Sequence, residues 1–559
     1  MQKNKLLIGA FLFSLILYSC SPSNNGDDHS IEVISTDTVK ATQILAARDA
    51  TATPTPFQPA PKPETIYFAD SVPQDWIQEY GNLTLNDDST TADLVLEISG
   101  QAELSQIAQF ERIYAVGVPF DTVADNISIV ELRSLWSTGT TSIVGYDQIL
   151  MAETTYKAFS QFWGLPKKSS VKLVEKQELI SDLWAQSDAF AILPFEDIEP
   201  KIKILKVDGI SPLDRPMDVE NYGLTITYSL SASQEAAALL QPEIDQIKSI
   251  IPTTNRDESK MTVVMMTGTT ALARVTLKKI DLNGFEYPVE MIKDWFLSAD
   301  LRHVSNEVSF MEGCAYVDAY TMQFCSKPDQ IKVLENIGVN VVESTGNHLN
   351  DYPGDYFAKT LKMYQERGWL SFGGGINHEA AIQPATTEVN GNKIAFIGCN
   401  PVGFETAWAT ETRAGSANCD YDWMNTKIAE LKSQGFIVIT TFQAEEIDRQ
   451  MYDGFYRQKF KDAATAGADI VQGSQAHVPM GFEFVNNSLI HYGLGNFLFD
   501  QMEPHNIREF YDRHIIYNGK YINTELLTAT LTDWSRPVPM TYQDRQVLLS
   551  EIFDASGMR

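Results

Sequence analysis

The chain has 559 residues, 44% of them hydrophobic, which is enough for two or three globular domains with sizeable cores. It carries 73 acidic and 43 basic residues, a formal net charge of −30. This excess of acid argues against nucleic acid and anionic lipid headgroups as partners, because both are bound by clustered Lys and Arg.

The first 20 residues have the layout of a secretory signal peptide. Lys3 and Lys5 precede an apolar run over residues 6–17, which is too short to cross a bilayer as a helix. The run ends in LYSC (17–20), which resembles a lipobox, where the cysteine accepts a lipid. We therefore predict an extracytoplasmic lipoprotein, cleaved before Cys20 and anchored to the membrane there. The alternative is an ordinary signal peptide with a chance cysteine.

A flexible stalk is predicted over residues 21–63. Its last part, TATPTPFQPAPKP (51–63), is rich in proline and threonine. Proline fixes φ and removes a hydrogen-bond donor, so this stretch should be extended and unpacked. The stalk would hold the folded domains away from the membrane.

Residues 64–250 alternate strand-like and helical patterns, which predicts a first α/β domain. Its segments ISIVELRSLWSTG (127–139) and AFAILPFEDIEPKIKILKVDG (189–209) resemble periplasmic solute-binding proteins of the phosphate-binding type. The resemblance implies a cleft for a small oxyanion; the alternative is a domain that keeps only the fold. A polar linker is expected at 251–260, a second α/β domain at 261–535, and a tail at 536–559.

Seven strands expected in the second domain each lead into polar residues. Carboxyl ends of strands converge in α/β folds, so these residues are predicted to line one pocket. One polar strand end is ordinary turn chemistry, but the repetition favours a shared site, and two of only eight histidines, His348 and His477, belong to it. The other predicted pocket residues are Thr269, Asn306, Asn347, Asn400, Gln443, Gln475 and Asn496.

If Cys20 is lipidated, four cysteines remain: Cys314, Cys325, Cys399 and Cys419. Outside the cytoplasm they predict two disulfides, with three possible pairings. We favour the pairs that are close in sequence, Cys314 with Cys325 and Cys399 with Cys419. The alternative is four free buried thiols, and the spacings do not resemble a zinc site.

Five motifs of the second domain, in this order, resemble the CapA family of capsule-synthesis proteins, which is associated with poly-gamma-glutamate capsules: GTTALAR (268–274), ADLRHVSNE (299–307), STGNHLNDYPGDYFAKTL (344–361), GADIVQGSQAHV (467–478) and HYGLGNFLFD (491–500). The resemblance implies a four-layer α/β/β/α fold of the calcineurin-like metallophosphoesterase type. It also implies hydrolytic chemistry with divalent cations, held by oxygen and imidazole ligands. The implied metal ligands are Glu307, Asn347, His348, Glu445 and His477, of which His348, His477 and Glu445 would be catalytic.

Three positions depart from the family's pattern. The family's Gly-Asp is Gly268-Thr269 here, its His-Trp-Gly-x-Glu is TFQAE (441–445), and one of its two late histidines is Gln475. Threonine and glutamine are neutral and bind divalent cations poorly. We therefore expect at most one divalent cation, Mn or Zn, in place of a two-metal centre.

These residues leave two functions open. The first is a cell-surface protein of the CapA type that assists synthesis, export or anchoring of an anionic capsular polymer, with or without metal-dependent hydrolysis. The second is a non-catalytic protein that binds or senses a ligand in a degenerate phosphoesterase-like pocket. The expected partners are the membrane, through lipid at Cys20, and an anionic polymer or small oxyanion. The lost ligands favour binding over turnover.

Overall fold

The computed structural model describes residues 64–100, 104–142, 145–186, 188–318, 320–447 and 449–558. The predicted signal peptide, Cys20 and the predicted stalk lie outside these residues. Pro63–Arg559 forms one compact unit. No helix within the described ranges is long and apolar enough to cross a membrane.

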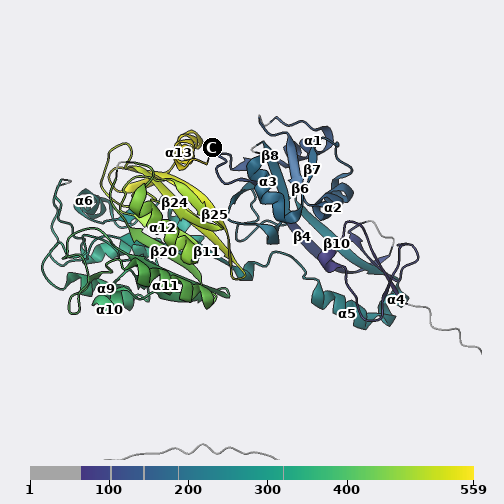
Figure 1. The fold of residues 1–559 in the computed structure, drawn as a ribbon, viewed down its shortest axis with the longest axis horizontal. Coiled ribbons are helices and arrows are strands. Elements are labelled where there is room, and N and C mark those ends of the chain that lie inside the picture. Colours follow the sequence, from purple (N-terminus) through teal and green to yellow (C-terminus); the bar gives the residue numbers. More distant parts are fainter. Residues whose placement is uncertain are drawn as a thin grey trace, which may run out of the picture. The chain divides into compact units, whose positions relative to one another are not determined.

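The N-terminal region, residues 64–250, is built on a ten-stranded mixed sheet with the order β2-β1-β3-β10-β4-β8-β6-β7 (Figure 1). The long strand β4 pairs with β10 along its first part and with β8 and β9 along its second, and β9 also pairs with β5. The strands are β1 (Thr65–Phe68), β2 (Thr84–Leu85), β3 (Leu94–Ile98), β4 (Ser105–Pro119), β5 (Asn126–Ile127), β6 (Gln148–Met151), β7 (Val171–Leu173), β8 (Ala189–Pro194), β9 (Ile202–Val207) and β10 (Thr225–Ala232).

Local sequence signals set the first helix of this region. Ser128 and Glu131 form a capping box at its start, and Gly139 adopts the left-handed conformation at its end. The helices are α1 (Ile129–Thr138), α2 (Glu153–Trp163), α3 (Leu179–Ala185), α4 (Gln234–Leu239) and α5 (Gln241–Ile250). The apolar faces of α1, α2 and α5 pack into one cluster with β3, β4 and β10.

The C-terminal region, residues 261–559, contains two larger sheets. The first has eight strands in the order β15-β14-β13-β11-β24-β25-β26, with β12 beside β13. Its strands are β11 (Met261–Thr267), β12 (Thr269–Thr270), β13 (Leu301–Asn306), β14 (Val341–Glu343), β15 (Leu370–Phe372), β24 (Arg508–Tyr517), β25 (Lys520–Thr532) and β26 (Arg536–Pro539).

The second sheet has six strands in the order β17-β18-β20-β21-β23-β22. These are β17 (Ala385–Val389), β18 (Asn392–Cys399), β20 (Ile437–Gln443), β21 (Ile470–Ser474), β22 (Phe482–Val485) and β23 (Ser488–His491); β16 (Gly374–Gly375) and β19 (Gly415–Ser416) form a separate small pair. The helices are α6 (Arg274–Asn283), α7 (Lys293–Leu297), α8 (Ile331–Asn336), α9 (Tyr356–Glu366), α10 (His378–Ala381), α11 (Tyr421–Ser433), α12 (Gly454–Ala466) and α13 (Tyr542–Ser556).

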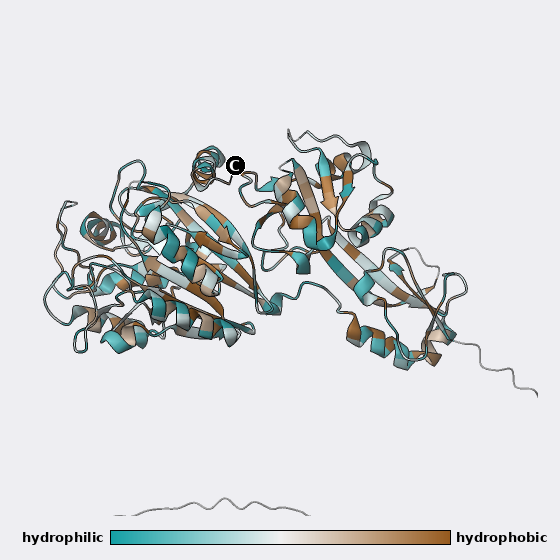
Figure 2. Ribbon diagram, viewed as in Figure 1, coloured by the Kyte–Doolittle hydropathy of each residue, from teal (hydrophilic) through white to brown (hydrophobic). Residues whose placement is uncertain are grey.

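The two sheets and their helices form four layers. In β11 the side chains alternate: Val264 and Met266 pack between the sheets, whereas Val263 and Met265 pack against α6, α7 and α8. Helices α11 and α12 cover the outer face of the six-stranded sheet. Their mixed hydropathy is visible in Figure 2, and α11 buries Met424, Ile428 and Leu431. The predicted α/β/β/α fold is therefore confirmed.

Both regions contribute to shared apolar clusters. Phe120, which follows β4, lies in the inter-sheet cluster together with Leu549 and Phe553 of α13. Phe195 contacts Tyr517 of β24 with ring centroids 5.0 Å apart. The division into domains ending at residue 250 and beginning at residue 261 stays a prediction.

The two local disulfides favoured from the sequence are both formed, Cys314–Cys325 and Cys399–Cys419. Each closes a loop that follows a strand of the C-terminal region. The prediction of these pairs is therefore confirmed.

Candidate functional site

Parallel strand pairs bring several polar loops to one edge of the C-terminal region. β11, β13 and β14 run parallel in the first sheet, and β18, β20, β21 and β23 in the second. Their carboxyl ends therefore carry the residues that follow them to the same edge. Strand direction therefore explains why polar residues from separate loops lie at one edge; that they line a pocket stays a prediction.

Gln443, the last residue of β20, is the hub of this edge. Its amide nitrogen donates toward Glu307 Oε1 and Asn347 Oδ1, each at 3.3 Å, and also contacts the Gln475 side-chain oxygen. Its own side-chain oxygen accepts a 2.9 Å hydrogen bond from Ser474. We call Glu307, Asn347, Gln443 and Gln475 the amide cluster.

Each of the two histidines of the site is fixed by one neighbour. His348 Nδ1 lies 2.7 Å from an Asp351 carboxylate oxygen, and His477 Nδ1 lies 2.7 Å from Asn496 Oδ1. Phe324 packs on the His348 ring, with centroids 4.0 Å apart. His477 is 4% exposed, whereas the His348 side chain is 14% exposed and is the more accessible imidazole.

Close backbone approaches hold these loops together. A Cβ at Gly268 would lie 1.9 Å from the Gly495 carbonyl oxygen, and one at Gly346 would lie 2.5 Å from that of Glu307. Gln475 and His477 adopt positive φ values of 82° and 57°, a strained conformation for residues with a side chain. Close packing between these loops therefore constrains the backbone conformation at this edge.

Burial sets the electrostatics of the site. Glu307 is 1% exposed, its Oε2 has no hydrogen-bond partner among the described residues, and burial raises its pKa to about 6. Burial alone would lower the pKa of His348, but the hydrogen bond to Asp351 and the charge of Glu307 outweigh it and raise that pKa. Burial lowers the pKa of His477, against the opposing charge of Glu446.

Arg274 is a site residue that the sequence reasoning missed. It is 5% exposed, donates from Nε to Asp500 at 2.9 Å, and lies over the rings of Phe324 and Phe499, at 4.6 and 5.1 Å from their centroids. Those two rings contact His348 and His477, respectively. Because Arg274 ends the GTTALAR motif, the motif itself carried the signal that could have found it.

Not every predicted residue joins the cluster. The carboxylate of Glu445 is exposed, and the next residue, Glu446, is the one whose charge acts on His477. Asn400 is fully buried and accepts from the Val402 backbone N–H at 2.7 Å. Asn306 donates to the Val308 carbonyl at 2.6 Å and to the Tyr364 hydroxyl at 2.8 Å.

Thr269 does reach the cluster, because its hydroxyl accepts from the Gln475 backbone N–H at 3.3 Å. Asn496 holds His477 and also donates to Gln501 at 3.1 Å. The structure thus gathers Thr269, Glu307, Asn347, Gln443, Gln475, His477 and Asn496 around one hub, with His348 at its edge, and leaves Glu445 outside.

The donor set does not fit a resident divalent cation. Across the described residues, no three His, Cys, Asp or Glu side chains lie close enough together to hold a metal ion. The positions around Gln443 are filled mainly by neutral amides that bond to one another, and Glu445, one of the five expected ligands, is exposed. Divalent cations prefer charged oxygen and imidazole ligands, so both a two-metal centre and a single Mn or Zn site conflict with this arrangement.

Comparison with known proteins agrees with the motifs. Residues 263–501 match the family model described as bacterial capsule synthesis protein PGA_cap. This part of the chain is similar to that capsule-synthesis family. The predicted resemblance to CapA is therefore confirmed.

Two relatives carry the CapA name. The chain is 25% identical over 268 residues to the capsule biosynthesis protein CapA of Bacillus anthracis, covering 46% of this chain and 64% of the relative. It is 26% identical over 238 residues to the PGA biosynthesis protein CapA of Bacillus subtilis (strain 168), covering 42% and 62%. The chain thus spans slightly less than two thirds of the length of these relatives.

Among solved structures, a phosphate transport receptor from Vibrio cholerae is 14% identical and has a TM-score of 0.27, covering 33% of this chain and 93% of the receptor. A 5'-nucleotidase precursor from Thermus thermophilus is 13% identical and has a TM-score of 0.29, covering 53% and 59%. Likenesses this slight carry no functional argument.

Proposed function

We propose that this protein is an extracytoplasmic lipoprotein, anchored through Cys20, that assists synthesis, export or anchoring of an anionic capsular polymer. In this proposal the site around Gln443 binds its ligand and does not catalyse metal-dependent hydrolysis. The family of residues 263–501 supports the role in capsule synthesis. The observation that carries the choice of binding over hydrolysis is the Gln443 hub.

The chemistry of the hub supports this choice. Metal-assisted phosphoester hydrolysis needs ligands that hold one or two cations and lower the pKa of a bound water. An amide can donate and accept hydrogen bonds at once, but it carries no charge and binds divalent cations weakly. A cluster of amides with one buried carboxylic acid is therefore suited to recognising a hydrogen-bonding ligand.

The accessible part of the site supports an anionic ligand. The raised pKa of His348 favours its imidazolium form, which donates a charge-assisted hydrogen bond. His348 is also the more exposed of the two imidazoles. We propose that an acidic group of the polymer contacts His348 and that neighbouring polar atoms of the ligand reach Asn347.

Metal content and turnover test the choice of binding over hydrolysis. The full-length chain, purified in detergent, is analysed by mass spectrometry for Mn and Zn and assayed with bis-p-nitrophenyl phosphate in the presence of either metal. We expect less than stoichiometric metal and no hydrolysis. Stoichiometric metal with hydrolysis that is lost in His348→Ala and His477→Ala, but kept in the control His378→Ala, would overturn the proposal; His378 is exposed and distant in sequence from both.

Binding tests the ligand class. Poly-gamma-glutamate, the polymer with which the resembling family is associated, serves as the anionic probe, and dextran serves as the neutral one. We expect the wild-type protein to bind poly-gamma-glutamate about tenfold more tightly than His348→Ala does. The difference corresponds to the loss of one charge-assisted hydrogen bond. Equal binding of both polymers, or an unchanged affinity in His348→Ala, would contradict the proposal.

The anchor is tested in cells. Cys20→Ala should release the protein from the membrane fraction, while Cys399→Ser with Cys419→Ser should leave it there. Retention of Cys20→Ala in membranes would show that the cysteine is not the anchor.

A further inference from the structure

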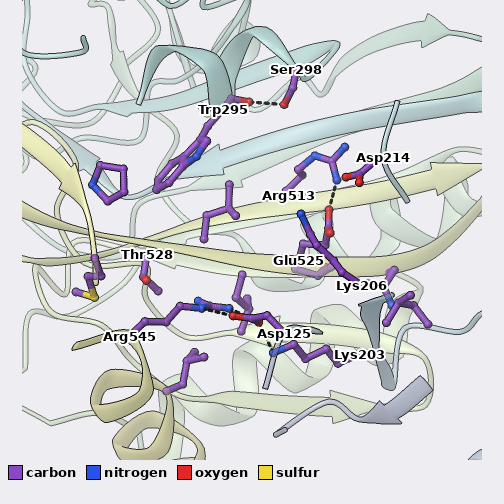
Figure 3. A pocket seen from close by; sticks show the side chains of 18 of the residues that line it. Asp125, Lys203, Lys206, Asp214, Trp295, Ser298, Arg513, Glu525, Thr528 and Arg545 are labelled. Atoms are coloured by element: carbon purple, nitrogen blue, oxygen red, sulfur yellow. Dashed lines mark hydrogen bonds and ion pairs between the residues drawn. The ribbon is translucent and has the colours of Figure 1, made fainter. Parts of the chain in front are cut away.

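A cavity of about 710 Å³ is lined by residues of both the N-terminal region and the C-terminal region (Figure 3). Its walls come from β9, from β25 and from α13, together with α7 and the residue that follows it. None of the residues of the amide cluster is among the described residues that line it. Its volume lies in the range of small-molecule sites, which is roughly 300–1,000 Å³.

The lining is unusually basic for this protein. It contains five basic and four acidic side chains, whereas the whole chain has 43 basic and 73 acidic residues. The five basic residues are Lys203, Lys206, Arg215, Arg513 and Arg545. In a chain of net charge −30, a cavity lined by five basic side chains favours the binding of an anion.

Most of these cations are already committed to protein carboxylates. Asp125 lies 2.6 Å from Lys203 Nζ and 2.8 and 2.9 Å from Arg545 Nε and Nη2. Arg513 pairs with Glu525, and Arg215 with Asp300. Figure 3 shows the Asp125 group and the Arg513–Glu525 pair at two separate places of the lining. They form fixed walls, so a ligand must be recognised by other groups.

Lys206 differs from the other four cations, because no carboxylate among the described residues pairs with it. Its ammonium group has no ion pair or hydrogen bond with any described residue, and in Figure 3 its side chain extends toward Arg513 and Glu525. It is half-buried, so part of its water shell is already lost. An incoming anion would therefore gain a charge-assisted contact at little further desolvation cost.

Buried polar atoms around the cavity also lack partners. Asn523 Oδ1, Thr528 Oγ1 and Arg545 Nη1 make no hydrogen bond with the described residues, although Asn523 is 1% and Thr528 4% exposed. Buried polar groups are nearly always hydrogen-bonded, because leaving such a bond unmade is costly. All three of these residues line the cavity, so a ligand held there could supply their missing partners.

The remaining wall is apolar. The apolar residues of the lining include Trp295, Met540, Leu549 and Phe553. Trp295 is half-buried and packs on Tyr511 with centroids 5.4 Å apart, so its position is fixed. Such a wall suits a ligand with an apolar body and adds nothing to the binding of a bare inorganic ion.

We propose that this cavity binds a small organic anion, with its carboxylate or phosphate group recognised by Lys206 and its apolar body against Trp295 and Met540. Its other polar atoms pair with Thr528 and Asn523. The bound anion contacts strands of both regions, and so it stabilises their association. This site is separate from the amide cluster and does not depend on the proposed capsule function.

Calorimetric titration of the full-length chain in detergent tests the site with three probes: phenyl phosphate and benzoate, which join an anionic group to an apolar ring, and inorganic phosphate. We expect phenyl phosphate or benzoate to bind and to raise the thermal midpoint. Lys206→Gln should weaken that binding about tenfold, the loss of one charge-assisted hydrogen bond. Lys248→Gln, on the exposed surface of α5, is the matched control and should bind as the wild type does.

Thr528→Val is a second variant whose folding is not in question. It keeps the side-chain shape and removes a hydroxyl that has no partner among the described residues. We expect weaker binding of the same probe with an unchanged or higher thermal midpoint. Absence of binding of both organic probes at millimolar concentration, equal binding of inorganic phosphate, or unchanged affinity in Lys206→Gln would each overturn the proposal. None of these outcomes bears on the metal and polymer tests of the amide cluster.

Discussion

The amide cluster and the cavity beside Lys206 differ in how their buried polar groups are paired. In the cluster, neutral side chains bond to one another around Gln443, and the one carboxyl group, Glu307, has a raised pKa. Around the cavity, full charges are neutralised in pairs, such as Asp125 with Arg545. Neutral amides need no counter-charge, whereas a buried ion depends on its partner. The two sites should therefore respond differently to mutation and to pH.

Removal of the Gln443 side chain, the hub of the amide cluster, should have the largest effect on stability. Gln443→Leu leaves the polar atoms of Glu307, Asn347 and Gln475 without their shared donor, and we expect a loss of about 3 kcal/mol of unfolding free energy. Denaturation in urea measures it. Gln434→Leu is the control, because Gln434 is exposed, follows the last residue of α11 and donates only to Glu430 of that helix with its side chain; it should change stability by less than about 0.5 kcal/mol. Equal effects of the two changes would show that the hub is not a structural centre.

Breaking an ion pair beside the cavity should cost slightly less. Asp125→Ala leaves Lys203 and Arg545 without their carboxylate, and we expect a loss of about 2–3 kcal/mol. The figure is reduced because the Asp125 side chain is 35% exposed and water screens part of the loss. Asp453→Ala, which removes a partner of Arg449 at an exposed pair, is the control. A stability loss no larger than that of the control would remove the contrast between the two sites.

Titration separates the sites further. The pKa of Glu307 is raised to about 6 in the folded protein, so the folded state holds its proton more tightly than the unfolded state does. Its contribution to stability is therefore present below the unfolded pKa and is lost as pH rises from about 4.5 to 6, a change of about 2 kcal/mol. Glu307→Gln should match the wild type near pH 4 and exceed its thermal stability at pH 7.5. A difference that is constant across this range would show that Glu307 does not titrate there.

The smallest effect on stability is expected at Lys206. Because its ammonium group has no partner among the described residues, Lys206→Gln should alter the unfolding free energy by less than about 0.5 kcal/mol without ligand. Thermal unfolding with and without phenyl phosphate measures this. A large loss in the absence of ligand would mean that Lys206 supports the fold, and its role in ligand recognition would need separate proof.

Much of the fold could be predicted from local patterns. The spacing of Met424, Ile428 and Leu431 marks the buried face of α11, and Ser128 with Glu131 marks the start of α1. The polar residues after each parallel strand marked the site, because strand direction alone brings them to one edge. The short separations of 11 and 20 residues favoured the two disulfides that form.

Other features of the site had no local signal. Periodicity could not distinguish Glu445 from Glu446, because both follow β20 in a loop whose backbone is set by its neighbours. The spacing of the motifs suggested metal ligands, but it could not show that the Gln443 side chain would bond to those of Glu307, Asn347, Ser474 and Gln475. Such choices depend on distances between loops, which the sequence of one loop does not encode.

By itself, the sequence determined the strands and helices, the resemblance of residues 263–501 to a capsule-synthesis family and the edge where polar residues gather. These follow from hydrophobic period, chain direction and motif order, all of which are local. Only the tertiary structure decided which polar groups pair and where a cavity remains. Asp125 and Arg545 are 420 residues apart in the chain, yet they meet at one wall. Partner choice over such separations is set by the packing of whole regions against each other, and no local pattern specifies it.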